Sequence, residues 1–182
     1  LSATDAYRRH GWTAKNGYEE FVIQHVSEGP AGTPRRLTAL LYLPQGGTPP
    51  YPVIAVNHGT NGVGPNCGPT HERIVSDYMA QPLVGQGYAI VAADYHGMGV
   101  DEGVYAYGVG DGEGRAILDG VRALYNFKDA RFDGKTMLTD ELFLYGHSQG
   151  GHATLFAQKL YDASVGPRLL GAVSVAPGLA DL

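Results

Sequence analysis

One short motif in the sequence can support nucleophilic chemistry. Residues 146–150 read Gly-His-Ser-Gln-Gly and match the pattern G-x-S-x-G, with an apolar run at 141–145 before them and a helix-like segment from Gly151 onward. In this context a sharp strand-to-helix turn exposes the Ser148 hydroxyl, and the glycines leave room where a Cβ would clash. The backbone N–H of Gln149 is then placed to bind the oxyanion that forms when a carbonyl is attacked. We therefore predict Ser148 as a nucleophile; the alternative is an ordinary glycine-rich turn.

A second candidate segment, residues 57–60, follows the apolar run at 53–56 and reads Asn-His-Gly-Thr. In folds that carry the G-x-S-x-G turn, the loop after the third strand provides another N–H group to the oxyanion. Because glycine permits a close backbone approach, the Thr60 N–H is the predicted donor, with Asn61 beside it as another candidate. For His58 we favour a structural imidazole that fixes the loop over a role in proton transfer.

A third segment, residues 94–99, follows the apolar run at 88–93 and reads Asp-Tyr-His-Gly-Met-Gly. It is expected at the same edge of the sheet, where ligands of α/β proteins bind. We interpret Asp94 as a carboxylate that orders this loop. The side chains expected to line the site are those of His58, Asn61, Tyr95, His96 and His147. A solvated position fits His96 equally well.

The sequence does not offer a complete catalytic triad. Hydrolases with this motif carry the acid and then the histidine after the serine, and a serine hydroxyl without a base is a weak nucleophile. After Ser148 the only acids are Asp162 and Asp181, and the only imidazole is that of His152. His152 precedes both acids and lies in the helix next to Ser148, so its ring should pack beside the turn. We therefore predict that this chain alone is inactive.

The elements that must position these residues alternate between strand and helix. Nearly continuous apolar runs predict strands of a mostly parallel sheet with helices on both faces; they lie at 53–56, 88–93, 142–145 and 169–176. Runs at 21–26 and 37–43, joined by a Gly/Pro-rich segment, predict antiparallel N-terminal strands. Apolar stripes predict helices at 71–84, 114–127 and 149–161, and Pro82 should kink or shorten the first. The fold class is therefore α/β, with an N-terminal segment and first strand in 1–35 and the core in 36–182.

Composition and charge exclude several classes of protein. The chain has 182 residues, of which 43% are hydrophobic and 17% charged, so it can bury a sizeable core and is not a disordered tail. Its net charge of −5 argues against nucleic acid as a partner, and no run of apolar residues is long enough for a membrane span. Cys67 is the only cysteine, so it cannot form a disulfide within the chain.

Six segments in order carry a family resemblance. They lie at 58–60, 67–69, 87–91, 94–99, 114–119 and 146–153, and together they resemble the secretory lipases of the α/β-hydrolase group, which include fungal lipase A-type enzymes and actinobacterial relatives. The resemblance covers about residues 36–182. The chain has Gly68 and Thr70 where the family usually reads Cys-Ala-Pro-Ser, which affects the shape of the site entrance.

The resemblance implies a secreted hydrolase of carboxylic esters, with a small-molecule ester or a lipid as substrate. It implies a Ser–Asp–His triad, no metal or organic cofactor, and a helical cap after the sixth strand. It also implies that the missing Asp and His lie beyond residue 182, and we hypothesise that a second polypeptide chain carries them and is bridged to this one through Cys67. Two alternatives stay open: a non-catalytic binding scaffold of the same architecture, and an enzyme of this fold that acts on amides, lactones or acetylated small molecules.

Overall fold

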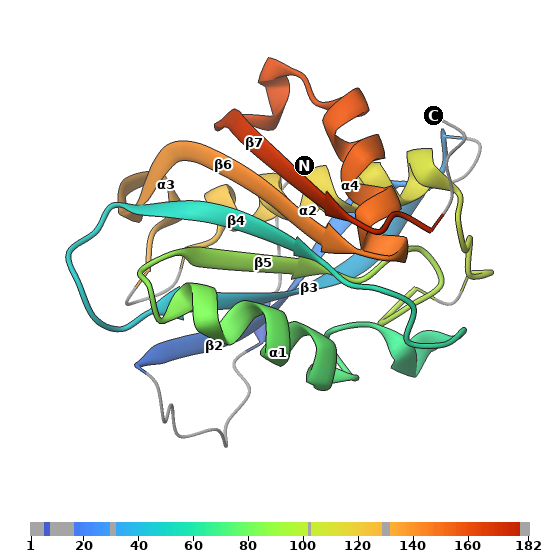
Figure 1. Ribbon diagram of the computed structural model, residues 1–182, viewed down its shortest axis with the longest axis horizontal. Coiled ribbons are helices and arrows are strands. Elements are labelled where there is room, and N and C mark those ends of the chain that lie inside the picture. The colour runs from blue at the N-terminus through green and yellow to red at the C-terminus, as the bar shows by residue number, and fades with distance from the viewer. Residues whose placement is uncertain (1–5, 8–16, 30–31, 102, 129–131, 179–182) are drawn as a thin grey trace.

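The computed structural model describes residues 6–7, 17–29, 32–101, 103–128 and 132–178. They form one seven-stranded sheet in the order β1-β2-β3-β5-β4-β6-β7 (Figure 1). The strands are β1 (Ala6–Tyr7), β2 (Tyr18–Glu28), β3 (Pro34–Pro44), β4 (Tyr51–Asn57), β5 (Ala89–Ala93), β6 (Leu138–His147) and β7 (Arg168–Val175). The helices are α1 (Arg73–Val84), α2 (Gly110–Asn126), α3 (Gly134–Met137) and α4 (Gln149–Leu160), with short 3₁₀ turns η2 (Pro65–Cys67) and η3 (Ala163–Val165).

The sheet is mixed, as the sequence predicts. β4 pairs in parallel with β5 and β6, and β6 pairs in parallel with β7. β3 pairs antiparallel with both β2 and β5, and β1 antiparallel with β2, so five of the seven strands run in one direction. The carboxyl ends of β4, β5, β6 and β7 therefore share one edge, where three of the candidate segments begin. The α/β class with antiparallel N-terminal strands is confirmed.

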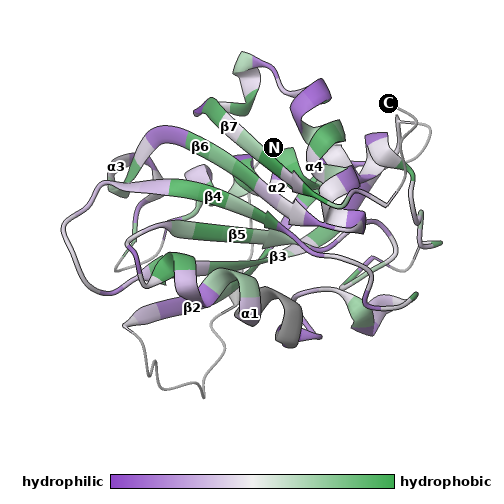
Figure 2. Ribbon diagram, viewed as in Figure 1, coloured by the Kyte–Doolittle hydropathy of each residue, from purple (hydrophilic) through white to green (hydrophobic). Residues whose placement is uncertain are grey.

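Helices cover the two faces of the sheet unequally. Figure 1 shows α1 on one face and both α2 and α4 on the other. The buried core on the α2/α4 face is large and includes Leu41, Val91, Ile117 and Leu144. A smaller buried cluster lies under α1. The hydrophobic colouring of Figure 2 follows the strands β4, β5 and β6 through the centre of the molecule, as expected for strands that are buried from both sides.

Two helices differ from the sequence-based prediction, α2 in where it begins and α1 in the effect of its proline. α2 begins at Gly110, four residues before the predicted start, because Gly110 and Gly114 let the helix approach α4 closely. A Cβ at Gly110 would overlap the Phe156 ring, and one at Gly114 would lie 2.8 Å from the Ala157 nitrogen. α1 continues through Pro82 to Val84, so the proline falls in the last turn and does not end the helix.

Candidate active site

Ser148 lies at the turn where β6 gives way to α4. Its backbone has φ 58° and ψ −120°, a conformation that L-residues other than glycine rarely adopt. The turn needs its glycines, because a Cβ at Gly146 would overlap the Gly150 carbonyl and one at Gly150 would overlap the Asn57 carbonyl. The Ser148 N–H donates to the Val175 carbonyl at 2.9 Å, which ties the turn to β7. The side chain is half-buried at the carboxyl edge of the sheet.

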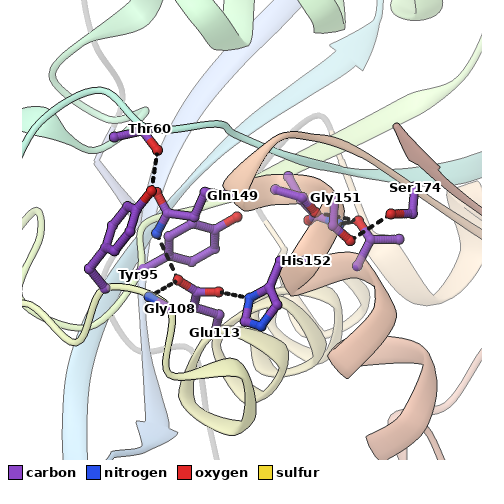
Figure 3. Close-up of polar contacts among 12 residues, drawn as sticks. Thr60, Tyr95, Gly108, Glu113, Gln149, Gly151, His152 and Ser174 are labelled. Carbon is purple, nitrogen blue, oxygen red and sulfur yellow. Dashed lines mark hydrogen bonds and ion pairs between the residues drawn. The ribbon is translucent and has the colours of Figure 1, made fainter. Parts of the chain in front are cut away.

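The loop after β4 comes directly against this turn. A Cβ at Gly59 would lie 3.2 Å from the His147 carbonyl oxygen and 3.6 Å from Ser148 Cβ, so only glycine fits without displacing a neighbour. Thr60 follows on the exposed side, where its hydroxyl lies 2.9 Å from that of Tyr107 (Figure 3). The structure thus brings the two predicted oxyanion segments, 59–60 and 148–149, side by side.

His58 is a buried part of this loop. Its ring stacks on Tyr95 with centroids 4.2 Å apart, and the Tyr95 hydroxyl donates to the His58 carbonyl at 3.1 Å. His58 Nδ1 lies 2.8 Å from the Gly59 carbonyl. Burial lowers the pKa of His58 to about 4, only partly offset by the contact with the Gly59 backbone. The imidazole is therefore neutral at pH 7 and anchors the loop.

The loop after β5 is fixed by two buried acids. Asp94 accepts hydrogen bonds from the hydroxyls of Thr38 and Thr70 and from the Thr70 N–H at 3.1 Å. Burial raises its pKa, and the hydrogen bonds act in the opposite direction. Asp101 binds Arg35 and accepts from the Gly97 N–H at 2.8 Å. Both carboxylates hold loop backbone, the role expected of Asp94.

His96 is buried, with 2% of its surface exposed, so the solvated alternative is wrong. Its Nδ1 lies 3.7 Å from an Asp101 carboxylate oxygen, and Gly112 of α2 approaches its ring. Burial lowers the pKa of His96, and the Asp101 charge opposes that shift. The ring fills space between the loop and α2. His147, by contrast, is exposed next to Gly59, and Asn61 is half-buried at the start of the following loop.

A buried polar network that the sequence did not reveal lies beneath the turn. Glu113 in the first turn of α2 accepts a hydrogen bond from Gln149 Nε2 at 2.7 Å and faces His152 Nδ1 at 3.0 Å (Figure 3). Gln149 Nε2 also donates to the Tyr105 hydroxyl at 2.6 Å. All of Glu113, Gln149 and His152 are 2–3% exposed. The only signal in the sequence is the pair of acids, Asp111 and Glu113, among the glycines of 110–114.

Comparison with known proteins identifies a family whose fold agrees with the observed structure over much of the chain. The family model described as secretory lipase matches residues 70–178. The chain belongs to the secretory lipase family. The α/β-hydrolase fold of the family agrees with the observed strand order and with the serine turn after β6.

Individual relatives of this secretory lipase-family chain are longer proteins. Lipase A of Moesziomyces aphidis is 26% identical over 161 residues, which cover 81% of this chain and 32% of that protein. The structure of the rice cell wall degrading esterase LipA from Xanthomonas oryzae matches with a TM-score of 0.73 and 25% identity, over 88% of this chain and 42% of that one. Candida antarctica lipase A in its closed state matches in fold, with a TM-score of 0.72 and 23% identity over 94% and 41%. The chain thus spans about a third to two fifths of the length of these relatives.

Among the described residues of this chain, no side chain is placed to act as a base for the Ser148 hydroxyl. His152 packs against Phe156 and turns its Nδ1 to Glu113, and no hydrogen bond joins the Ser148 hydroxyl to an imidazole in the described ranges. Asp162 is exposed at the far end of α4, where it accepts from the Ser164 N–H. Asp181 lies outside the described residues. Cys67 is a free, half-buried thiol.

No membrane-crossing helix is found among the residues that the structure describes, since none is both long and apolar enough. The same described ranges hold no group of three or more His, Cys, Asp or Glu side chains arranged to bind a metal ion. The candidate site described above consists of the serine turn, the two adjacent loops and the polar network below them.

Proposed function

We propose that this chain carries the nucleophilic half of a serine carboxylic-ester hydrolase, with Ser148 as the nucleophile. One observation carries the proposal: Ser148 is held at φ 58° in a turn against which the Gly59 backbone is pressed. Strain of this kind persists only where the surrounding structure imposes it, and it occurs preferentially at active sites. Family membership supports the ester-hydrolase class.

The predicted oxyanion donors fit this role. The N–H groups of Thr60 and Gln149 donate to no acceptor in the described part of the chain, although Gln149 is buried and opens α4. Free N–H groups at a helix start attract negative charge. Two such donors aimed at one oxygen stabilise a tetrahedral intermediate, and loss of one donor typically costs about 10²–10³ in rate.

The proposed reaction proceeds through an acyl-enzyme. Ser148 Oγ attacks the ester carbonyl carbon and passes its proton to an imidazole, while the carbonyl oxygen becomes an oxyanion held by the Thr60 and Gln149 N–H groups. The carbon–alkoxy bond then breaks, and the alcohol leaves with the proton from the imidazolium. Water attacks the acyl-enzyme in the same way, gives its proton to the imidazole, and releases the carboxylic acid and free Ser148.

We propose that the imidazole and its partner carboxylate come from polypeptide outside residues 1–182, on this or a second chain. β7 is the last strand of the sheet on that side, and Leu170, Val173 and Val175 on it are 47%, 56% and 40% exposed. An apolar open edge of this kind normally pairs or is covered. Residues 1–182 alone should accordingly show no turnover.

Reaction of the complete protein with a fluorophosphonate probe tests the proposal. We expect one covalent adduct on Ser148, located by peptide mass spectrometry, and no adduct in Ser148→Ala. That variant should lose turnover by about 10⁴-fold or more. Ser174→Ala is a matched control, because Ser174 lies nearby and only donates to the Gly151 carbonyl at 2.9 Å. An unlabelled Ser148, or full activity in Ser148→Ala, would identify a binding scaffold instead.

The proposal extends to the covalent partner and the location of the protein. Because Cys67 is the only cysteine of the sequence, a disulfide would join it to polypeptide outside these residues, and disulfides form in oxidising compartments. The family description is that of a secretory lipase, which supports an extracellular protein. Intact mass measured with and without reductant tests the bridge; identical masses would exclude it.

A further inference from the structure

Glu113 is a buried acid without an assigned role, and it faces the underside of the Ser148 turn. Its carboxylate is 2% exposed and binds three groups: the Gly108 N–H at 3.1 Å, Gln149 Nε2 at 2.7 Å and His152 Nδ1 at 3.0 Å. An ionised carboxylate is costly to bury unless its oxygens accept several hydrogen bonds. The three bonds satisfy that need, and they require His152 to carry its proton on Nδ1.

Two of the three donors belong to the first turn of α4. Gln149 directly follows Ser148, and the His152 N–H donates to the Ser148 carbonyl at 3.1 Å. Glu113 therefore contacts α4 at the residue after Ser148 and again about one turn later, as Figure 3 shows. The second hydrogen of Gln149 Nε2 is taken by the Tyr105 hydroxyl at 2.6 Å. The Gln149 side chain is thus held from two sides.

These contacts fix the position of the Gln149 backbone, whose N–H is a donor in the proposed reaction. A displacement of Gln149 would move its N–H away from the oxyanion position, and such a donor is effective only at 2.7–3.1 Å from the oxygen. The Glu113 carboxylate makes its hydrogen bonds in the described ranges to Gly108, Gln149 and His152 and not to Ser148, so it would act through Gln149 and His152. Any shift of α4 away from α2 would also leave the buried carboxylate with the Gly108 N–H in place of three donors, and this cost opposes movement of α4.

We propose that Glu113, together with His152, is a positioning residue that fixes the Gln149 N–H for oxyanion binding; the inference rests on the proposed function. Removal of the carboxylate should lower kcat and leave KM nearly unchanged, because the oxyanion forms only after the substrate is bound. The donor is displaced in such a variant and not deleted, so we expect a loss of about 10- to 100-fold in kcat.

The test compares three variants of the complete protein with p-nitrophenyl acetate as substrate. Glu113→Ala should show the kcat loss with KM changed by less than about threefold. Glu113→Gln should recover most of kcat, because the amide oxygen can accept from Gln149 and the amide N–H₂ can donate to His152 in its other tautomer. Glu20→Ala is the matched control: it removes another buried carboxylate, which pairs with Arg73 on the α1 face of the sheet, and it should lower thermal stability without lowering kcat.

The outcomes separate this inference from the proposed function. Equal kcat losses in Glu113→Ala and Glu20→Ala would reduce Glu113 to general support of the fold and overturn the inference, as would a loss confined to KM. A Glu113→Gln variant as impaired as Glu113→Ala, with a native thermal transition, would also contradict it. If Ser148→Ala stays active, the proposed function itself fails, whatever the Glu113 variants do.

Discussion

The two faces of the sheet differ in how completely the helices of this chain cover them. On the α2/α4 face, helices pack at glycine contacts, and Glu113, Gln149 and His152 form hydrogen bonds deep under the serine turn. On the α1 face, one helix covers part of the sheet, and an apolar pocket of about 440 Å³ lies open between α1 and the strands. The packing on the α2/α4 face supports the strained backbone of Ser148, whereas the α1 face leaves apolar side chains exposed.

The difference explains which parts of the proposed active site are present. The contacts that shape the Ser148 turn come from the end of β4, the Gly59 loop, the start of α4 and the end of β7. The open pocket is lined by Phe143, Tyr145 and Val173 of the last two strands, which are the strands nearest the edge where further polypeptide would join. Under the proposed function, this chain supplies the nucleophile and the oxyanion donors, while the base and its partner carboxylate come from polypeptide that covers that edge.

The largest predicted effect tests how tightly the first face is packed. Gly150→Ala should destabilise the protein by about 3 kcal/mol or more in urea unfolding, because the new Cβ overlaps the Asn57 carbonyl of β4. Gly171→Ala on β7 is the matched control, since its Cβ would lie 3.7 Å from the Phe143 ring, an ordinary contact. We expect a change within about 0.5 kcal/mol there. Similar costs at both positions would remove the contrast between the faces.

Much of the fold was predictable because its signals are local. Buried strands of a mostly parallel sheet need continuous apolar runs, and each of the six predicted strands is found, with β2, β3, β4 and β6 extending beyond the predicted runs at both ends. The turn at Ser148 was predictable for a similar reason: two glycines flank it, and no other residue fits at Gly146 or Gly150. The two-residue strand β1 and the single turn of α3 are too short to leave a pattern.

The polar network was not predictable because its partners are distant in sequence. Glu113 has an amphipathic helix around it, where a charged residue normally lies on the solvent face. Its burial depends on donors from Gln149 and His152, 36 and 39 positions away. Likewise, the early start of α2 runs against the low helix propensity of glycine, and it becomes favourable only when Phe156 and Ala157 of α4 are in place.

A second prediction concerns the acid sensitivity that a buried histidine on the α2/α4 face gives to the protein. His25 on β2 is 5% exposed and lies beside Gly120 of α2. Burial lowers its pKa from 6.5 to about 4, with Asp119 opposing and His96 adding to the shift. The folded protein therefore leaves His25 neutral, while the unfolded chain binds a proton below about pH 6.5. The free energy of unfolding is therefore unaffected by protonation of His25 above pH 6.5. It decreases as the pH falls toward 4, by up to about 3 kcal/mol.

The measurement is the free energy of urea unfolding at pH 7, 6, 5 and 4 for the wild type and for His25→Leu. The apolar side chain removes the titrating group, so the variant should lose less stability than the wild type between pH 6.5 and 4. The remaining decline belongs to other buried groups such as His58, whose pKa is also lowered to about 4. Parallel curves for the two proteins would show that the buried His25 does not control acid sensitivity.

The smallest predicted effect tests whether other polypeptide covers the α1 face in the complete protein. Val173→Thr keeps the shape of the side chain and adds a hydroxyl, which costs about 1–2 kcal/mol only where it is buried without a partner. Val173 is 56% exposed on β7, so in residues 1–182 the change should be nearly neutral, whereas in the complete protein it should cost that amount. Val53→Thr, at a position with 0% exposure, gives the cost of full burial for comparison. If Val173→Thr is neutral in the complete protein too, nothing packs over this strand, and the acid–base residues must approach Ser148 without covering the open face.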